Sequence, residues 1–319
     1  MKDPVITDHQ IQLLVDRFGE RLLRDQPMSR HSVINIGGPA DFLVSASNKE
    51  ELEADVRFLW DEGIPFMLFG SGSNTLISDA GIRELVLIND AKNVEFIDEE
   101  GQPPFVYAES GASIGGLSRR TGQKGWSGLE WASGIPGTVG GSVVNNAGAF
   151  GSDIAASLSM AEILHPIDDK ILRSEWSADD FGYEYRNSVI KSGEKSAVIL
   201  SATFQLERST PEAVKSKLSA IAEKRQASQP GGASLGSMFK NPPGDFSGRL
   251  IEAAGLKGSR VGEVEISQQH ANFFINRGEA TANQVATLIA MVRDRVSEKF
   301  GVELELEIQF VGDWNKDYQ

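Results

Sequence analysis

Cysteine is absent from this chain of 319 residues. The absence excludes disulfide bonds, thiolate nucleophiles, cysteine-ligated metals and a flavin attached through sulfur, and it agrees with a reducing compartment. Histidine is scarce as well. The four histidines do not have the spacing of metal ligands, so we expect no metal site and assign none of them to catalysis: His9, His31, His165 and His270.

Long apolar runs are also missing, and none has the length of a membrane-spanning helix. The first residues, MKDPVITDHQIQ, lack the basic and apolar regions of a signal peptide. We therefore expect a cytoplasmic protein with no membrane partner. Basic residues are outnumbered, because 31 Lys and Arg residues stand against 45 Asp and Glu residues, for a net charge of −14. This imbalance disfavours nucleic acid as a partner.

The pattern of apolar residues predicts helices that alternate loosely with short strands. Ile11, Leu14 and Phe18 share one face of a helix that we expect over residues 7–24. Ser47 and Glu50 have the spacing of a capping box at the start of a second helix. Strands are predicted at 66–69, 85–88, 105–110 and 197–206. This arrangement favours an α+β fold.

The composition changes near residue 207, where we place a domain boundary. Thr210 and Pro211 begin a long predicted helix. Thr281 and Gln284 have capping-box spacing at the start of another helix, which Gly301 is expected to end. The sequence therefore predicts one domain over residues 1–206 and a second domain over residues 207–319.

The last predicted strand, VELELEIQF at 302–310, alternates strictly between apolar and polar residues. Glu303, Glu305 and Glu307 are thereby expected on one face of the strand. An acidic strand face of this kind is ordinarily a solvated edge. Periodicity alone does not distinguish one glutamate from the other two.

Two glycine-rich segments carry no charged residue. GIPGTVGGSVVNNAGAFG at 134–151 has six glycines, and FGSGSN at 69–74 follows a predicted strand directly. Such segments are most often turns. Their backbone N–H groups can also bind a phosphate without any charged side chain. Neither is a Rossmann or P-loop motif, since Thr75 stands where a third glycine would be needed. The pair favours a dinucleotide site.

Seven motifs in collinear order resemble the MurB family of UDP-N-acetylenolpyruvoylglucosamine reductases. They are NIGGPADFLV (35–44), GSGSNTLISDAG (70–81), GIPGTVGGSVVNNAGAFG (134–151), YRNS (185–188), GSMFKNP (236–242), LIEAAGLKGSRVGEVEISQQHANFFIN (250–276) and FGVELELEI (300–308). The resemblance implies an FAD-binding module of the PCMH or vanillyl-alcohol-oxidase type over 1–206, built from two α+β subdomains. It also implies a C-terminal α+β substrate-binding domain over 207–319.

The resemblance implies non-covalent FAD and NADPH as the co-substrate. It assigns FAD contacts to both glycine-rich segments, with the amides of Asn145 and Asn146 near the cofactor. The implied residues are Gly70, Ser71, Gly72, Ser73 and Asn74, together with Gly134, Ile135, Pro136, Gly137, Thr138, Gly140, Gly141, Asn145, Asn146, Gly148 and Ala149.

The implied reaction is the reduction of an enolpyruvyl ether on a UDP-sugar in peptidoglycan synthesis. A hydride from flavin N5 reaches C3 of the enolpyruvyl group, and a proton from Ser237 reaches C2. Arg186 and Glu307 match the family's other catalytic positions. Without the resemblance, these three residues are read as a turn serine, a surface ion pair and a solvated acidic edge.

Tyr185, Lys240 and Asn241 are the implied substrate contacts. The spacing between the motifs resembles the shorter type of the family, which lacks a segment bearing a tyrosine loop. The expected partners are therefore a UDP-sugar and NADPH, and we expect a monomer. Two alternatives remain open from the residues: another FAD-dependent oxidoreductase of the PCMH class, and a non-catalytic protein that binds FAD or a nucleotide.

Overall fold

The structure is a computed structural model that describes residues 6–314. Its described residues form two compact units that alternate along the chain. The first unit holds residues 6–44, 64–87 and 226–314, and the second unit holds residues 45–63 and 88–225. This division follows packing rather than function. The boundary at 206/207 between an FAD-binding and a substrate-binding domain stays a prediction.

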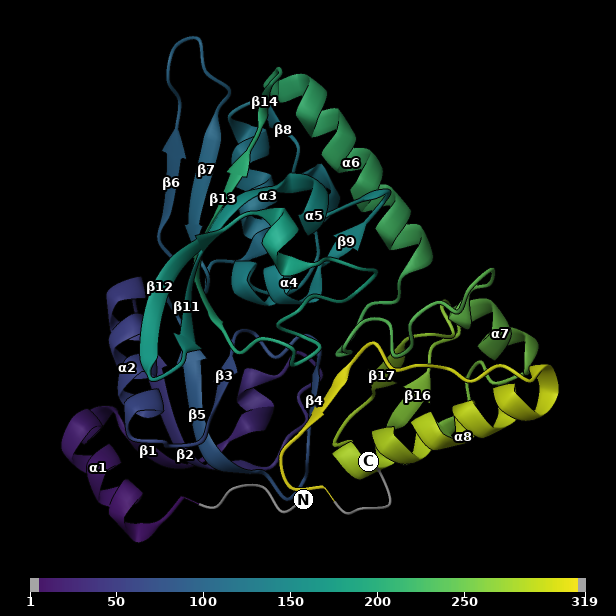
Figure 1. Cartoon of the computed structure of the whole chain (residues 1–319). Coiled ribbons are helices and arrows are strands. Elements are labelled where there is room, and N and C mark those ends of the chain that lie inside the picture. Colours follow the sequence, from purple (N-terminus) through teal and green to yellow (C-terminus); the bar gives the residue numbers. More distant parts are fainter. Residues whose placement is uncertain (1–5, 315–319) are drawn as a thin grey trace. The chain divides into compact units, whose positions relative to one another are not determined.

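The first unit begins with helix α1 (Asp8–Phe18), the 3-10 turn η1 (Gly19–Arg21), strand β1 (Leu23–Pro27) and the 3-10 turn η2 (Met28–His31). Strands β2 (Pro39–Ala46), β3 (Phe66–Phe69) and β5 (Ile82–Asn89) complete a sheet of order β1-β2-β5-β3 (Figure 1). The expected helix over 7–24 is therefore too long. Gly19 ends it with a φ of 52°, and the next residues pair with β2, Leu23 lying opposite Leu43.

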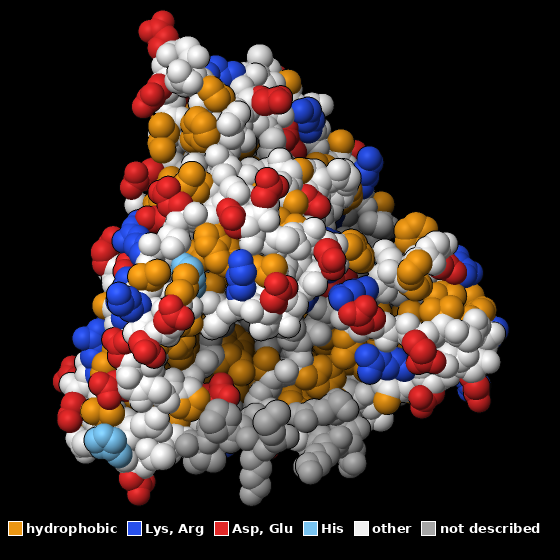
Figure 2. Space-filling view, viewed as in Figure 1, with side chains coloured by type: hydrophobic (Ala, Val, Ile, Leu, Met, Phe, Trp, Pro, Cys, Tyr) orange, Lys and Arg blue, Asp and Glu red, His pale blue; other side chains and the backbone are white. Residues whose placement is uncertain are grey.

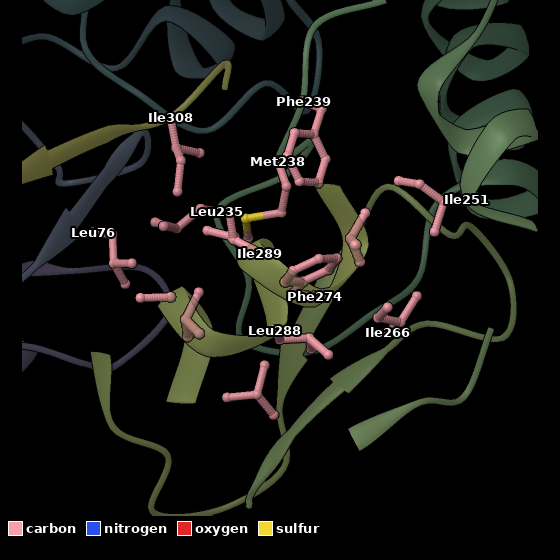
Figure 3. Close-up of a cluster of buried hydrophobic side chains, with 14 of the residues drawn as sticks. Leu76, Leu235, Met238, Phe239, Ile251, Ile266, Phe274, Leu288, Ile289 and Ile308 are labelled. Carbon is pink, nitrogen blue, oxygen red and sulfur yellow. The ribbon is translucent and has the colours of Figure 1, made fainter. Parts of the chain in front are cut away.

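The rest of the first unit packs around one long helix, α8 (Ala282–Phe300). It includes helix α7 (Ser247–Ala253) and an antiparallel sheet of β15 (Arg260–Val261), β16 (Val264–Ile266) and β17 (Phe274–Asn276). Strand β4 (Thr75–Ile77) pairs in parallel with β18 (Gln309–Val311). Figure 3 shows Met238, Phe239 and Phe274 directed into the resulting core together with Leu288 and Ile289.

The predicted capping box of α8 is confirmed. Thr281 accepts a hydrogen bond from the N–H of Gln284, the Gln284 side chain returns to the N–H of Thr281, and Gly301 caps the C-terminus in the left-handed region. An apolar stripe of α8 is buried in this core and includes Val285, Leu288, Ile289, Val292 and Val296. These signals are local, because a cap and a stripe need only neighbours within one helix.

The predicted strand over 302–310 is wrong, since only Gln309–Val311 forms a strand. The backbone of the preceding residues forms hydrogen bonds with several different segments instead of pairing with one strand. Lys240 donates its N–H to the carbonyl of Glu305 and Glu307 donates to Met238, whereas Gln309 donates to Asn74. The alternation still decides burial: Leu304 and Ile308 are buried, Glu303 and Glu305 are exposed, and Glu307 is half-buried.

The second unit contains a five-stranded antiparallel sheet of order β12-β11-β13-β7-β6. Its strands are β6 (Val94–Ile97), β7 (Phe105–Glu109), β11 (Leu158–Ile167), β12 (Lys170–Trp176) and β13 (Val198–Gln205). Helices α3 (Ile114–Gln123), α4 (Val139–Asn145) and α5 (Ile154–Ser157) share a core with β7, β11 and β13 (Figure 1). The unit thus buries one face of its sheet under short helices.

Smaller elements complete the second unit. They are α2 (Lys49–Asp61), β8 (Trp126–Ser127), η3 (Glu130–Ala132), β9 (Gly148–Ala149), β10 (Ser152–Asp153), η4 (Ala178–Phe181), β14 (Glu207–Arg208) and α6 (Pro211–Ser228), whose last residues belong to the first unit. The predicted capping box of α2 is displaced by one residue. Asn48 is the N-cap and accepts from the N–H of Glu51, while the N–H of Ser47 donates to the Glu51 carboxylate.

The remaining sequence predictions of elements are confirmed, including the helix that begins at Pro211 and the four strands. The α+β fold class is confirmed as well. Within residues 6–314, no helix has both the length and the apolar character needed to cross a membrane. Lys and Arg side chains are interspersed with Asp and Glu side chains over the face that Figure 2 shows.

A network of charged groups joins α2 to the five-stranded sheet of the second unit. The Glu162 carboxylate on β11 accepts from Lys49 Nζ at 2.9 Å and from the hydroxyl of Ser201 at 2.8 Å, and it also pairs with Arg173. Burial alone would raise the pKa of Glu162, but these bonds outweigh burial and lower the pKa to about 2. The ionised carboxylate therefore stabilises the folded state.

We expect Glu162→Gln to lower the free energy of unfolding by about 1–2 kcal/mol near neutral pH, since the partly exposed pairs are screened. Folding lowers the pKa of Glu162 from 4.5 to about 2. Its contribution to the free energy of unfolding is therefore fully present above pH 4.5 and is lost as the pH falls towards 2. Urea unfolding of both proteins between neutral pH and about pH 3 measures this.

The matched control is Glu175→Gln, an exposed glutamate paired directly opposite Glu162 on β12. It should change stability by less than about 0.5 kcal/mol at every pH. A difference between Glu162→Gln and the unmodified protein that stays constant down to pH 3 would contradict the assignment, because it would not depend on ionisation.

Candidate active site

The segment that carries Ser237 runs between two other segments of the first unit. Ser237 forms an isolated antiparallel bridge with Phe273, and Phe239 forms another with Leu306. The N–H of Met238 donates to the carbonyl of Asn272, and the carbonyl of Met238 accepts from the N–H of Glu307, each at 2.9 Å. Ser237 is half-buried, whereas the side chains of Met238 and Phe239 are buried in the core. The serine is therefore held next to two residues that are buried in the core of its unit.

Glu307 lies beside this segment because of the Met238 bond. A second contact fixes its backbone from the other side, since the Asn74 amide donates to the Glu307 carbonyl at 3.1 Å. The structure thus brings the backbones of Ser237 and Glu307 together. Their positions are far apart in the sequence, and no local pattern relates them. Glu303 and Glu305 differ from Glu307 in being exposed.

Arg186 belongs to the second unit and has an unusual backbone. Its φ is 57°, in the left-handed region that disfavours residues other than glycine. Its guanidinium donates to the carbonyl of Gly148 at 2.6 Å and to that of Asn146 at 3.4 Å. Lys191 donates to the Arg186 carbonyl at 2.9 Å. The arginine is therefore anchored on the glycine-rich segment that the sequence assigns to FAD.

That segment is not one continuous loop. Residues 134–138, which include Gly134, Ile135, Pro136, Gly137 and Thr138, form a turn, and Thr138 caps helix α4. Gly140, Gly141 and Asn145 lie in α4, Asn146 ends it with a φ of 45°, and Gly148 and Ala149 form β9. The central glycines therefore sit in a short helix followed by a tight turn.

Several of these glycines are required by packing within the protein. A Cβ at Gly140 would lie 2.9 Å from Cβ of Ser110, and one at Gly148 would lie 2.6 Å from Cβ of Asp153. Gly134 and Gly137 have φ values of 72° and 134°. Gly141 differs, because a Cβ there would meet only the Thr138 hydroxyl at 3.4 Å. Gly141 is thus exposed backbone that a ligand could approach.

The first glycine-rich segment, 70–74, connects β3 to β4. Gly72 has a φ of 59°, and a Cβ there would lie 2.2 Å from the carbonyl oxygen of His31. The segment is irregular at Gly70, Ser71 and Ser73. Asn74 uses its side-chain amide for the Glu307 carbonyl. The close approach of His31 and the role of Asn74 were not predicted from the sequence.

The two asparagines of the second segment have different environments. Asn146 is buried, and its amide donates to the carbonyl of Glu184 while its Oδ1 accepts from the N–H of Ala155. Asn145 donates to the carbonyl of Gly141, but its Oδ1 is buried and accepts no hydrogen bond from the described part of the chain. A buried acceptor of this kind requires a partner. With the open backbone at Gly141, it fits an uncharged site for FAD.

The predicted substrate contacts lie in both units. Tyr185 is 54% exposed, with the Arg186 guanidinium 5.2 Å from its ring centroid. Lys240 forms an ion pair with Glu305. Asn241 is exposed, but its Oδ1 accepts from the N–H of Ser247 at 3.1 Å. The Asn241 side chain therefore pairs with the first residue of helix α7 through its oxygen.

One further side chain approaches the second glycine-rich segment. Arg225, near the end of α6, donates to the carbonyl of Ser133 at 3.3 Å, packs against Gly134, and lies over the ring of Phe150 at 5.7 Å. Burial lowers the pKa of its guanidinium. The sequence predicted Arg225 only as part of a helix. Its neighbours are Lys224 and Gln226, so no local feature of the sequence distinguishes it.

Comparison with known proteins identifies two domains. Residues 40–167 match the FAD binding domain family, and residues 227–311 match the C-terminal domain family of UDP-N-acetylenolpyruvoylglucosamine reductase. The second match includes both Ser237 and Glu307. An FAD-binding module alone would be shared by other flavin oxidoreductases, so the C-terminal match is the more specific finding.

Curated relatives match over most of the chain. The UDP-N-acetylenolpyruvoylglucosamine reductase of Chloroflexus aurantiacus is 40% identical over 293 residues, covering 91% of this chain and 97% of the relative. The reductase of Rubrobacter xylanophilus is 42% identical over 289 residues, covering 91% and 95%.

A solved structure is also similar. The MurB enzyme of Thermus caldophilus is 31% identical, with a TM-score of 0.75, covering 91% of this chain and 98% of that one. Sequence and fold agree over about nine tenths of the chain, and the chain belongs to the UDP-N-acetylenolpyruvoylglucosamine reductase family.

Proposed function

We propose that this chain reduces the enolpyruvyl group of UDP-N-acetylenolpyruvoylglucosamine to give UDP-N-acetylmuramate, with FAD as its cofactor and NADPH as the co-substrate. The observation that carries the proposal is the match of residues 227–311 to the reductase C-terminal domain, together with hydrogen bonds that bring Ser237 and Glu307 into adjacent segments.

Bound FAD supplies the hydride for C3 of the enolpyruvyl group. The chain must then deliver a proton to C2. The Ser237 hydroxyl is our proposed donor, held by the Met238 and Phe239 bonds. A serine hydroxyl is a weak acid, so a neighbouring group must stabilise its conjugate base or orient it. The Glu307 carboxylate, brought alongside by its backbone, is the proposed orienting group.

Hydride addition at C3 would place negative charge on C2 and the adjacent substrate carboxylate until C2 is protonated. Arg186 is the proposed partner for this carboxylate, because a guanidinium offers paired, planar N–H donors. Its left-handed backbone and its bonds to Asn146 and Gly148 support a fixed orientation. Tyr185, Lys240 and Asn241 remain the proposed contacts of the UDP-sugar. Cytoplasmic location and a monomer also stay predictions.

Ser237→Ala should separate the two halves of the reaction. NADPH should bleach the flavin at nearly the unmodified rate, because that half needs no proton at C2. Reoxidation by the enolpyruvyl UDP-sugar should slow by about 10²–10⁴-fold, the usual contribution of general acid catalysis. Stopped-flow absorbance of the flavin measures both rates.

Equal slowing of both halves would instead assign Ser237 to cofactor binding. If the enolpyruvyl UDP-sugar fails to reoxidise the unmodified protein, the proposed substrate is wrong.

Glu307→Gln should lower kcat by at least about 10²-fold with little loss of bound FAD, because the amide keeps the size of the side chain but removes its charge. Glu303→Gln is the matched control, since Glu303 is an exposed glutamate of the same segment. Glu305 is less suitable, because it pairs with Lys240. Steady-state rates and the FAD content of both variants decide the assignment. Loss of activity in Glu303→Gln with a normal Glu307→Gln would refute it.

A further inference from the structure

Asn272 is a buried polar residue to which the reaction gives no role. It is 3% exposed and lies within the apolar run ANFFIN. Its Oδ1 accepts from the N–H of Phe239 at 3.0 Å, and its Nδ2 donates to the carbonyl of Phe239 at 2.8 Å. One amide side chain thus bonds both polar groups of a single residue, two positions after Ser237.

The main chain of Asn272 contacts the same segment. Its carbonyl accepts from the N–H of Met238 at 2.9 Å. The Nδ2 group also donates to the hydroxyl of Ser247 at 2.9 Å, and that hydroxyl lies 3.1 Å from Oδ1 of Asn241. Asn272 therefore connects the Ser237 segment to the start of helix α7.

These bonds complete the hydrogen bonding of a short irregular segment. Met238 bonds Asn272 through its N–H and Glu307 through its carbonyl, and the N–H of Lys240 bonds Glu305. Phe239 has no regular strand beside it, because the bridges at Ser237 and Phe239 are isolated ones. The Asn272 amide takes the place of a neighbouring strand there. An apolar side chain at 272 would leave two buried backbone groups of Phe239 without this partner.

We propose that Asn272 is a positioning residue for the reaction: its side chain fixes the Ser237–Asn241 backbone and so holds the Ser237 hydroxyl beside Glu307. The proposal rests on the proposed function of Ser237. Asn272 itself touches neither FAD nor substrate in this account. It acts by preventing the segment from shifting, and a shift of about 1 Å at a reacting group can cost about 10²-fold in rate.

Asn272→Ala should increase the exchange rate of the Phe239 amide hydrogen, which hydrogen-exchange mass spectrometry of a peptide spanning residues 237–241 detects. Reoxidation of the flavin by the enolpyruvyl UDP-sugar should slow by about 10–10²-fold, while FAD content and flavin reduction by NADPH stay near unmodified values. The matched control is Asn276→Ala. Asn276 ends strand β17, four residues after Asn272, and its side chain bonds the Ile34 carbonyl and the N–H groups of Gly278 and Ala280 rather than the Ser237–Asn241 segment.

Asn272→Asp keeps the shape and gives a readout that a purely structural role would not change. Its carboxylate can accept from Phe239 N–H but cannot donate to the Phe239 carbonyl, whereas the protonated acid can do both. Burial favours the protonated form. The reoxidation defect should therefore shrink as the pH falls from about 8 to about 5.5. The imidazole of His270, whose Nδ1 accepts from the Asn272 N–H, lies beside this position, so the unmodified enzyme is measured across the same range.

The double variant Ser237→Ala/Asn272→Ala distinguishes this inference from the proposed function. If Asn272 acts through Ser237, its replacement should cost little further rate once Ser237 is absent. Multiplied effects of the two changes would overturn the positioning role while leaving Ser237 as the proton donor. If Ser237→Ala alone reoxidises normally, the proposed function of Ser237 fails.

If Asn272→Ala does not fold, Asn272→Asp decides the matter. A defect that does not change with pH, relative to the unmodified enzyme, would overturn the proposal. So would an equal loss of rate in Asn276→Ala.

Discussion

The candidate site depends on one constraint: buried backbone groups must find hydrogen-bond partners. The side chains of Met238 and Phe239 are buried in the core of the first unit, and their backbone is buried with them. Asn272 and Glu307 satisfy that main chain from both sides. The residue just before this segment is Ser237. The position of the proposed proton donor is thus a consequence of how the core closes around its two neighbours.

The glycines of the two glycine-rich segments differ in what their missing side chain allows. Gly72, Gly140 and Gly148 are required because another segment of the protein approaches them closely, which any Cβ would prevent. A Cβ at Gly141 would meet only the Thr138 hydroxyl, and the buried Oδ1 of Asn145 accepts no hydrogen bond from residues 6–314. A glycine-rich sequence therefore does not by itself mark backbone that contacts a cofactor. The part suited to FAD is narrower than the eighteen-residue motif that suggested it.

Local signals in the sequence predicted local structure well. The capping box of α8, the start of α6 and the strands β3 and β13 each follow from a few neighbouring residues. Two failures were local and small, because Gly19 ends the first helix early and Asn48 rather than Ser47 is the N-cap of α2. The larger failure involves partners that are distant in sequence. Residues 302–308 alternate between apolar and polar residues as a strand does. Their backbone hydrogen-bond partner nevertheless changes, from Met238 at Glu307 to Asn74 at Gln309, so no continuous strand forms. The family motifs supplied Ser237, Arg186 and Glu307, which periodicity could not. For Asn272, the sequence offered one signal, a polar residue between the apolar residues Ala271 and Phe273.

Backbone strain points to the same region of the second unit. Six described residues other than glycine have positive φ, and three of them are Asn146, Phe150 and Arg186. Each costs on the order of 1 kcal/mol or more, and such strain persists only where surrounding bonds impose it. Here the Arg186 guanidinium bonds the carbonyls of Asn146 and Gly148, so the strained residues hold one another. Strain concentrates where a protein fixes reacting groups in advance. In this unit it therefore supports the same arginine and the same glycine-rich segment that the family motifs selected from the sequence.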